Sequence, residues 1–150
     1  MTNCYKYLKS HKIQTYASYP YTGKASTCQY NSALGVVGVT SYTALPANDP
    51  VSLMNAVAKQ PVSIAVAASS STYYFYKSGV INSSACGTSI NHAVTLIGYG
   101  HDTASNQDYW LIKNSWGASW GEAGYFRVLR NTVSGPGICG ILKLSSYPTL

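Results

Sequence analysis

Two Trp-Gly pairs, Trp116-Gly117 and Trp120-Gly121, lie only four residues apart in the segment 113–125, which reads KNSWGASWGEAGY. Tryptophan carries a large apolar ring, and glycine tolerates backbone conformations that other residues avoid. The repeated pair therefore predicts tight backbone bends around two stacked indole rings. By itself, this segment fits a purely structural aromatic corner as well as one that supports a functional site.

Periodic apolar residues predict the secondary structure around this corner. A helix is expected over residues 3–13, with Tyr5 and Leu8 facing inward, and a second helix follows the capping sequence Asn-Asp-Pro at 48–50. An aromatic-rich turn or short helix is expected over residues 69–76. Strands are expected over residues 36–42, 62–66, 92–100, 109–114, 124–130 and 141–147. From residue 92 onward, the pattern indicates an antiparallel meander that is closed or barrel-like.

The charge pattern argues against nucleic acid as a partner. The chain carries ten Lys and Arg against four Asp and Glu, a net charge of +6. These bases are scattered, and only Lys6, Lys9 and Lys12 recur at three-residue spacing, which is typical of a solvated helix face. No apolar run is long enough to cross a bilayer, and no leader-like apolar stretch follows Met1, so no membrane partner is expected. Met1 is expected to fall inside a domain.

The four cysteines, Cys4, Cys28, Cys86 and Cys139, show no C-x-x-C spacing, so no metal site is expected. Four cysteines permit three pairings, and spacing alone does not choose among them. The sequence Asn-Ser-Ser at 82–84 is an N-glycosylation sequon in an expected surface loop. Whether the sequon is used or unused stays open from the sequence.

A histidine at the start of an expected strand is the main candidate for chemistry. His92 begins the apolar strand, and Asn114 stands at the end of the neighbouring one. A lone histidine is usually structural. An asparagine oxygen could, however, accept a hydrogen bond from one ring N–H, which leaves the other ring nitrogen free for a nucleophile. The indole of Trp116 would then keep water away from that hydrogen bond.

NHAV at 91–94, followed by KNSWGASWGEAGY at 113–125, resembles the histidine and asparagine motifs of the papain-like cysteine peptidases. YPYTG at 19–23, QPVSIAV at 60–66 and GICGILKLSSYP at 137–148 also resemble family segments in order. The resemblance covers about residues 5–149. It implies a papain-like α+β fold, an antiparallel β-barrel-like sheet domain with the end of the helical half. Residues 1–22 would be a remnant of the helical half, and residues 23–150 the β-rich half.

The resemblance also implies roles for individual residues. His92 would be the catalytic base and acid, and Asn114 would orient its imidazole. Trp116 would shield that pair, and Trp120 would form the wall on the leaving-group side of the cleft. No metal or organic cofactor is implied.

A second group of residues is implied to bind substrate. Ala65, Ala93 and Leu144 fall where the family lines its main specificity pocket, which would here be apolar with no acidic floor. Asn91 is expected to touch the substrate backbone.

The cysteine roles follow from the resemblance as well. Cys86 and Cys139 match a family disulfide, and Cys28 matches a half-cystine whose partner lies upstream of this chain. Cys4 matches no family cysteine and is expected to be a small buried side chain. The family's nucleophile lies in a C-G-[SA]-C-[WY] segment, which these residues do not contain, and none of the four cysteines is expected to replace it.

The sequence thus predicts the C-terminal part of a cysteine endopeptidase that hydrolyses peptide bonds in peptide or protein substrates. Its Cys-His-Asn site would take the cysteine from an N-terminal segment or a second chain. The family implies a lysosomal, vacuolar or secreted location. Two alternatives remain open: a non-catalytic papain-like protein used for binding or structure, and an unrelated extracellular binding module whose motifs are coincidental.

Overall fold

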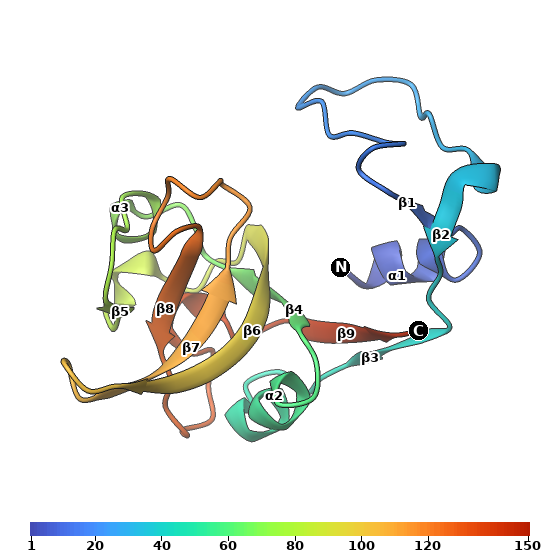
Figure 1. Cartoon of the computed structure of the whole chain (residues 1–150). Helices are drawn as coiled ribbons and strands as arrows, with labels where there is room; N and C mark the ends of the chain where they lie inside the picture. The colour runs from blue at the N-terminus through green and yellow to red at the C-terminus, as the bar shows by residue number, and fades with distance from the viewer. The chain divides into compact units, whose positions relative to one another are not determined.

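The computed structural model describes all 150 residues, which divide into two compact units. Unit 1 comprises Met1–Thr43 and Pro148–Leu150, and unit 2 comprises Ala44–Tyr147. Figure 1 colours both units along the chain. The predicted halves 1–22 and 23–150 refer to the family's architecture and stay a prediction.

Unit 1 contains one helix and a small sheet. Helix α1 (Thr2–Leu8) is followed by β1 (Ile13–Gln14), the 3-10 turn η1 (Ser32–Leu34) and β2 (Gly35–Val37), and β1 pairs antiparallel with β2. The segment 15–31 between β1 and η1 contains no helix or strand. Tyr5 is buried and its ring stacks on Tyr42 at a centroid distance of 5.8 Å.

Two sequence expectations in unit 1 are wrong in their bounds. The helix predicted to reach residue 13 ends at Leu8, because Ile13 pairs with Val37 in the small sheet. The single strand expected over residues 36–42 is two short strands, β2 and β3 (Ser41–Ala44). Between them the backbone turns to other partners, since Val39 N donates to Leu8 O and Thr40 N donates to Thr149 O.

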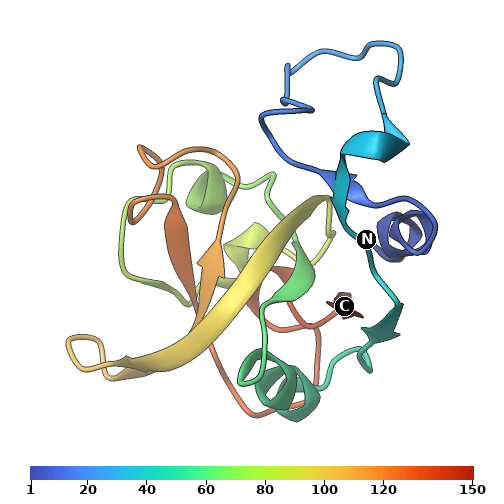
Figure 2. The same ribbon diagram turned by 45° about the vertical axis from the view of Figure 1, so that its right-hand side comes forward.

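Unit 2 is built around one sheet, in which β9, β4, β6, β7, β8 and β5 are neighbours in that order. Figure 2 shows β6 and β7 as a long twisted hairpin with β8 beside it. Its elements are α2 (Pro50–Val57), β4 (Val62–Val66), α3 (Ser71–Tyr74), β5 (Val80–Ile81), η2 (Ser84–Cys86), β6 (His92–Asp102), β7 (Gln107–Lys113), β8 (Tyr125–Leu129), η3 (Ile138–Gly140) and β9 (Ser145–Thr149). None of the chain's helices has the length and hydropathy that a membrane crossing requires.

Local sequence explains the elements of unit 2. The Asp49 carboxylate accepts hydrogen bonds of 3.0 Å from Val51 N and Ser52 N, and Pro50 follows in the first turn, as predicted for α2. Alternating residues of the strands face one core, and its largest fully buried side chains include Trp110, Tyr73, Phe126, Leu53, Ile64, Leu96 and Ile112. The predicted meander is confirmed for β6, β7 and β8, which pair antiparallel.

The C-terminal part of the predicted meander is wrong. Residues 141–144 are not a strand, because the backbone turns at Gly137, Cys139 and Gly140, which all have positive φ. Strand β9 begins at Ser145 and pairs with β4 rather than with β8. The two-residue strand β5 was too short for an alternation pattern, and it pairs parallel with β8.

Candidate active site

Strand pairing brings His92 and Asn114 together. Strands β6 and β7 are antiparallel, with Thr95 opposite Lys113, so the beginning of β6, where His92 lies, is next to the end of β7, which Asn114 follows. His92 Nε2 is 2.9 Å from Asn114 Oδ1. The two side chains are 22 positions apart in the sequence and within hydrogen-bonding distance in space.

The backbone of Ser115 fixes the tautomer of His92. Ser115 N donates a 2.8 Å hydrogen bond to Asn114 Oδ1, which identifies that atom as the amide oxygen. An oxygen accepts from His92 Nε2 only when this nitrogen carries the proton. In the neutral ring, Nδ1 therefore holds the lone pair and is the nitrogen that can accept a proton.

The pair is shielded from solvent on one side. Asn114 is 7% exposed, and its backbone N–H donates to Gly124 O at 2.9 Å. The Trp116 indole lies 5.3 Å from the His92 ring between centroids, at an interplanar angle of 36°. A hydrogen bond is stronger where apolar groups exclude water, so this indole stabilises the orientation of the imidazole.

The loop between β7 and β8 bends at the two Trp-Gly pairs. Gly117 and Gly121 have φ of 87° and 57°, in the left-handed region that favours glycine. A Cβ at Gly121 would lie 2.6 Å from Tyr125 O, so a larger residue would displace the loop. The prediction of tight bends is confirmed, whereas the prediction that the two indoles stack is wrong. Trp116 and Trp120 meet edge to face at 78° with centroids 5.3 Å apart, an arrangement that the ring quadrupoles favour.

Helix α3 supplies an aromatic residue that sequence reasoning did not connect to this site. Tyr73 is fully buried, and its ring centroid lies 5.4 Å from Trp116 and from Trp120, 5.1 Å from Phe126 and 6.3 Å from His92. The aromatic-rich segment 69–76 was visible in the sequence, but its distance along the chain from Trp116 concealed the contact. Tyr73 supports both indoles, and Trp116 in turn contacts His92.

Replacing Tyr73 with phenylalanine is expected to raise the free energy of unfolding by about 1 kcal/mol. The Tyr73 hydroxyl is buried without a hydrogen-bond partner, and burial raises its pKa. Removing an unsatisfied buried polar group removes its desolvation cost while the ring keeps its contacts. Denaturant titration of Tyr73→Phe measures the change, with the exposed Tyr74→Phe as the control. A clear loss of stability in Tyr73→Phe would mean that the hydroxyl has a partner after all.

Asn91 holds the chain beside the start of β6. Its Oδ1 accepts a 2.9 Å hydrogen bond from Ala68 N, and its Nδ2 donates to Ser69 Oγ. Its backbone N–H donates to Val66 O at 3.0 Å. The side chain thus fixes the segment after β4, and its expected contact with substrate backbone stays a prediction.

The three residues of the predicted specificity pocket lie close together on β4, β6 and the segment before β9. Ala65 in β4 lies directly opposite Ala93 in β6, and Ala65 N donates to Leu144 O at 3.1 Å. Ala93, which directly follows His92 in the sequence, is exposed, and Leu144 is 42% exposed. Both residues therefore present apolar surface to solvent. This arrangement supplies small and aliphatic side chains and no charge, and its role as a pocket stays a prediction.

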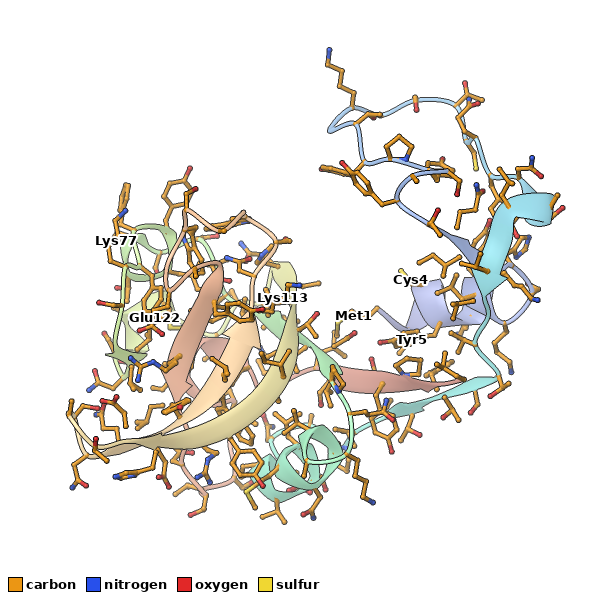
Figure 3. All side chains as sticks on the ribbon, in the orientation of Figure 1. Met1, Cys4, Tyr5, Lys77, Lys113 and Glu122 are labelled. Carbon is orange, nitrogen blue, oxygen red and sulfur yellow. A yellow bond between two sulfur atoms is a disulfide. The ribbon has the colours of Figure 1, made fainter.

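A charge network fastens the far end of the loop that carries the two tryptophans. Arg127 in β8 donates from Nε and Nη2 to Glu122 at 2.9 and 2.8 Å, and from Nη1 to Asp102 at 2.7 Å. Glu122 also accepts a 2.8 Å hydrogen bond from Gly79 N. Figure 3 labels Glu122 near this end of the loop and Lys113 at its beginning. The bidentate ion pair ties the loop to β8 and to the turn before β5.

Acid is expected to weaken the fold partly through Asp102. Hydrogen bonds from the Ser105 hydroxyl, and then from Arg127, lower the pKa of the Asp102 carboxyl to about 2. A carboxyl with a lowered folded-state pKa stabilises the protein above its unfolded value and loses that contribution as the pH falls. The loss should therefore run from about pH 4 to about pH 2. Thermal unfolding of wild type and Asp102→Asn across this range checks it, and a slope that is equally steep in the variant would contradict it.

The cysteines fall into two groups. Cys86 in η2 and Cys139 in η3 form a disulfide, the pairing that the resemblance implied. Cys4 and Cys28 are free and exposed. The expectation that Cys4 is buried is wrong, because it lies on the solvent side of α1, whose inward residue is Tyr5 (Figure 3).

Comparison with known proteins identifies the family. The sequence model described as papain family cysteine protease matches residues 1–149. The chain belongs to the papain family of cysteine proteases. Among papain-family relatives, a cathepsin L-like proteinase of Fasciola hepatica is 43% identical over 150 residues, which cover 99% of this chain and 44% of the relative. Fruit bromelain of Ananas comosus is 41% identical over 143 residues, covering 95% of this chain and 40% of the relative.

Solved structures of the papain family share the fold. The bromelain protease from Ananas comosus in complex with the E64 inhibitor superposes with a TM-score of 0.89 at 47% identity, covering 97% of this chain and 67% of that one. Digestive procathepsin L2 proteinase from the Tenebrio molitor larval midgut gives a TM-score of 0.90 at 35% identity, covering 100% of this chain and 47% of that one. The α+β, papain-like fold is therefore confirmed. The chain spans about two fifths of the length of the curated relatives that it matches.

Proposed function

We propose that this chain is the C-terminal part of a cysteine endopeptidase and that it supplies the histidine and asparagine of a Cys-His-Asn site. The observation that carries the proposal is the hydrogen bond between His92 Nε2 and Asn114 Oδ1, with the amide orientation set by Ser115 N. This arrangement leaves His92 Nδ1 as the nitrogen available to a thiol. A histidine held in one tautomer beside an indole is suited to general acid–base catalysis.

The reaction proceeds through proton transfers at His92 Nδ1. This nitrogen takes the proton of the nucleophilic cysteine, and the resulting thiolate attacks the carbonyl carbon of the peptide bond. The imidazolium then gives its proton to the leaving amine, which departs and leaves a thioester. Water attacks the thioester with His92 as base, the carbon–sulfur bond breaks to release the carboxylic acid product, and the imidazolium returns its proton to the thiolate. Asn114 keeps accepting from Nε2 throughout and stabilises the positively charged ring.

The nucleophile is proposed to come from outside these 150 residues. Cys86 and Cys139 are joined to each other, and Cys4 and Cys28 lie in sequence contexts unlike the family's nucleophile segment. An N-terminal segment or a second chain would provide the cysteine. In this assembly, residues 1–22 would belong to the helical half and residues 23–150 to the β-rich half.

The substrate is proposed to be a peptide or protein with an apolar side chain that enters the specificity pocket. Ala65, Ala93 and Leu144 would accept that side chain, Asn91 would contact the substrate backbone, and Trp120 would border the leaving group. These residues offer no carboxylate to a basic side chain. The disulfide is in keeping with a lysosomal, vacuolar or secreted protein, because disulfides persist in oxidising compartments.

The proposal is tested with the complete protein that contains this chain. It should hydrolyse a fluorogenic peptide, and the E64 inhibitor should block the reaction. A thiol-alkylating reagent should also block it, and substrate should protect against the reagent. Peptide mapping should place the protected, alkylated cysteine outside residues 1–150.

Two results would overturn the proposal. A substrate-protected label on Cys4 or Cys28 would refute an external nucleophile. A folded, complete protein that binds peptides but never cleaves them would favour the alternative, a non-catalytic papain-like protein used for binding.

A further inference from the structure

The sequon at residues 82–84 lies in an exposed loop of unit 2. Asn82, Ser83 and Ser84 are all exposed, directly after β5 and at the entry to η2. Asn82 itself belongs to neither a strand nor a helix. It is the only asparagine of the chain followed by the pattern X-Ser or X-Thr.

The side chains that a sequon needs are the ones left free by the fold. Ser83 Oγ accepts a 3.1 Å hydrogen bond from Ala85 N and caps η2. The amide of Asn82 and the hydroxyl of Ser84 take part in no such local bond. Ser83 therefore stabilises the local fold, while the Asn82 amide and the Ser84 hydroxyl stay accessible.

The surface beside Asn82 leaves room for a bulky substituent. An open hollow of about 340 Å³ lies there, lined by residues that include Tyr76, Lys77, Val80 and Asn82. A sugar on the exposed Asn82 amide can thus extend over the hollow and into solvent without displacing a buried side chain. Folding and modification are compatible at this position.

The chemistry of a neighbouring residue indicates the required compartment. Cys86, four positions after Asn82, forms the disulfide with Cys139. Disulfides form in oxidising compartments such as the lumen of the secretory pathway, and N-glycans are added in the same lumen. Disulfide and sequon thus call for the same environment during synthesis.

We propose that Asn82 carries an N-linked glycan. The donor is a lipid-linked oligosaccharide diphosphate. A bond forms between Asn82 Nδ2 and the first sugar carbon, the bond from that carbon to the diphosphate oxygen breaks, and the lipid diphosphate leaves with its electron pair. One amide proton is released to a base. The glycan places a hydrophilic, bulky group over this part of the sheet edge.

The test uses the complete protein, secreted from a eukaryotic host. Peptide mapping of the wild type should find the peptide containing Asn82 heavier by a glycan, and an N-glycan amidase should remove this mass. Asn82→Gln and Ser84→Ala should each eliminate the glycan on that peptide. Ser83→Ala is the matched control, because it changes the same loop and removes the η2 cap yet preserves the sequon.

Each outcome decides the proposal. An unmodified Asn82 peptide in the secreted, disulfide-bonded wild type would overturn it, as would loss of the glycan only in Ser83→Ala. Because the readout is the mass of one peptide, it does not depend on peptidase activity or on glycans elsewhere in the complete protein. A failure of the proposed catalytic function would leave this result unchanged.

Discussion

Replacing His92 with alanine is expected to lower kcat/KM for peptide hydrolysis by the complete protein about 10⁴-fold. Alanine removes both the base that activates the thiol and the acid that protonates the leaving amine. Without the imidazolium partner, less of the cysteine is thiolate at neutral pH. The assay is the initial rate on a fluorogenic peptide, together with the rate of thiol alkylation as a function of pH.

His101→Ala is the matched control for this variant. His101 also lies in β6, but its ring is exposed and pairs with Asp108 at 2.9 Å, away from Asn114. Its replacement should leave kcat/KM within about twofold, because surface substitutions away from special features change little. Full activity in His92→Ala, or an equal loss in His101→Ala, would contradict the assignment of His92.

Asn114→Ala separates orientation from proton transfer. Hydrogen bonds to charged groups contribute about 1.5–3 kcal/mol. Losing the hydrogen bond between His92 and Asn114 should therefore lower kcat about 10- to 100-fold, which is less than the effect of losing His92. The rate of thiol alkylation should also fall, because an imidazole that Asn114 no longer holds in place pairs less well with the cysteine. An alkylation profile identical to that of the wild type would indicate that Asn114 is only structural.

The sequence predicted the part of the site that depends on strand order. An antiparallel hairpin necessarily places the first residue of one strand beside the end of the next, so His92 and Asn114 could be paired from the two motifs alone. Asp49 with Pro50 likewise identified the start of α2. These features depend on local chemistry that the sequence states directly.

Other parts of the structure depend on contacts between distant segments. Tyr73 reaches the two indoles from a four-residue helix whose position no periodicity reveals. Cys139 adopts φ 55°, which a non-glycine residue avoids, and the turn that it helps to form delays the strand predicted over residues 141–147 until Ser145. In both places tertiary packing overrides the local preference of the chain.

Removing the disulfide is expected to lower the free energy of unfolding by about 4 kcal/mol, because the crosslink closes a loop of 53 positions. This loss is a large part of the total stability of a typical domain, about 5–15 kcal/mol. The best variant is Cys86→Ala with Cys139→Gly. Glycine adopts the left-handed conformation of Cys139 without steric cost, so the variant adds no backbone strain at this position. Urea titration of wild type and double variant measures the difference.

Cys4→Ser provides the control, since this exposed, free cysteine should change stability by no more than about 0.5 kcal/mol. The same loss should follow reduction of the wild type, because both treatments free the unfolded chain from the same constraint. The disulfide joins η2 to η3, and Ala67 N donates to Cys139 O at 2.8 Å, which places η3 against the end of β4. His92 lies opposite Val66 at that end of β4, so opening the bond should also lower kcat for peptide hydrolysis. A double variant with wild-type stability would show that packing alone holds η3, and that the crosslink is not what keeps this end of the sheet in place.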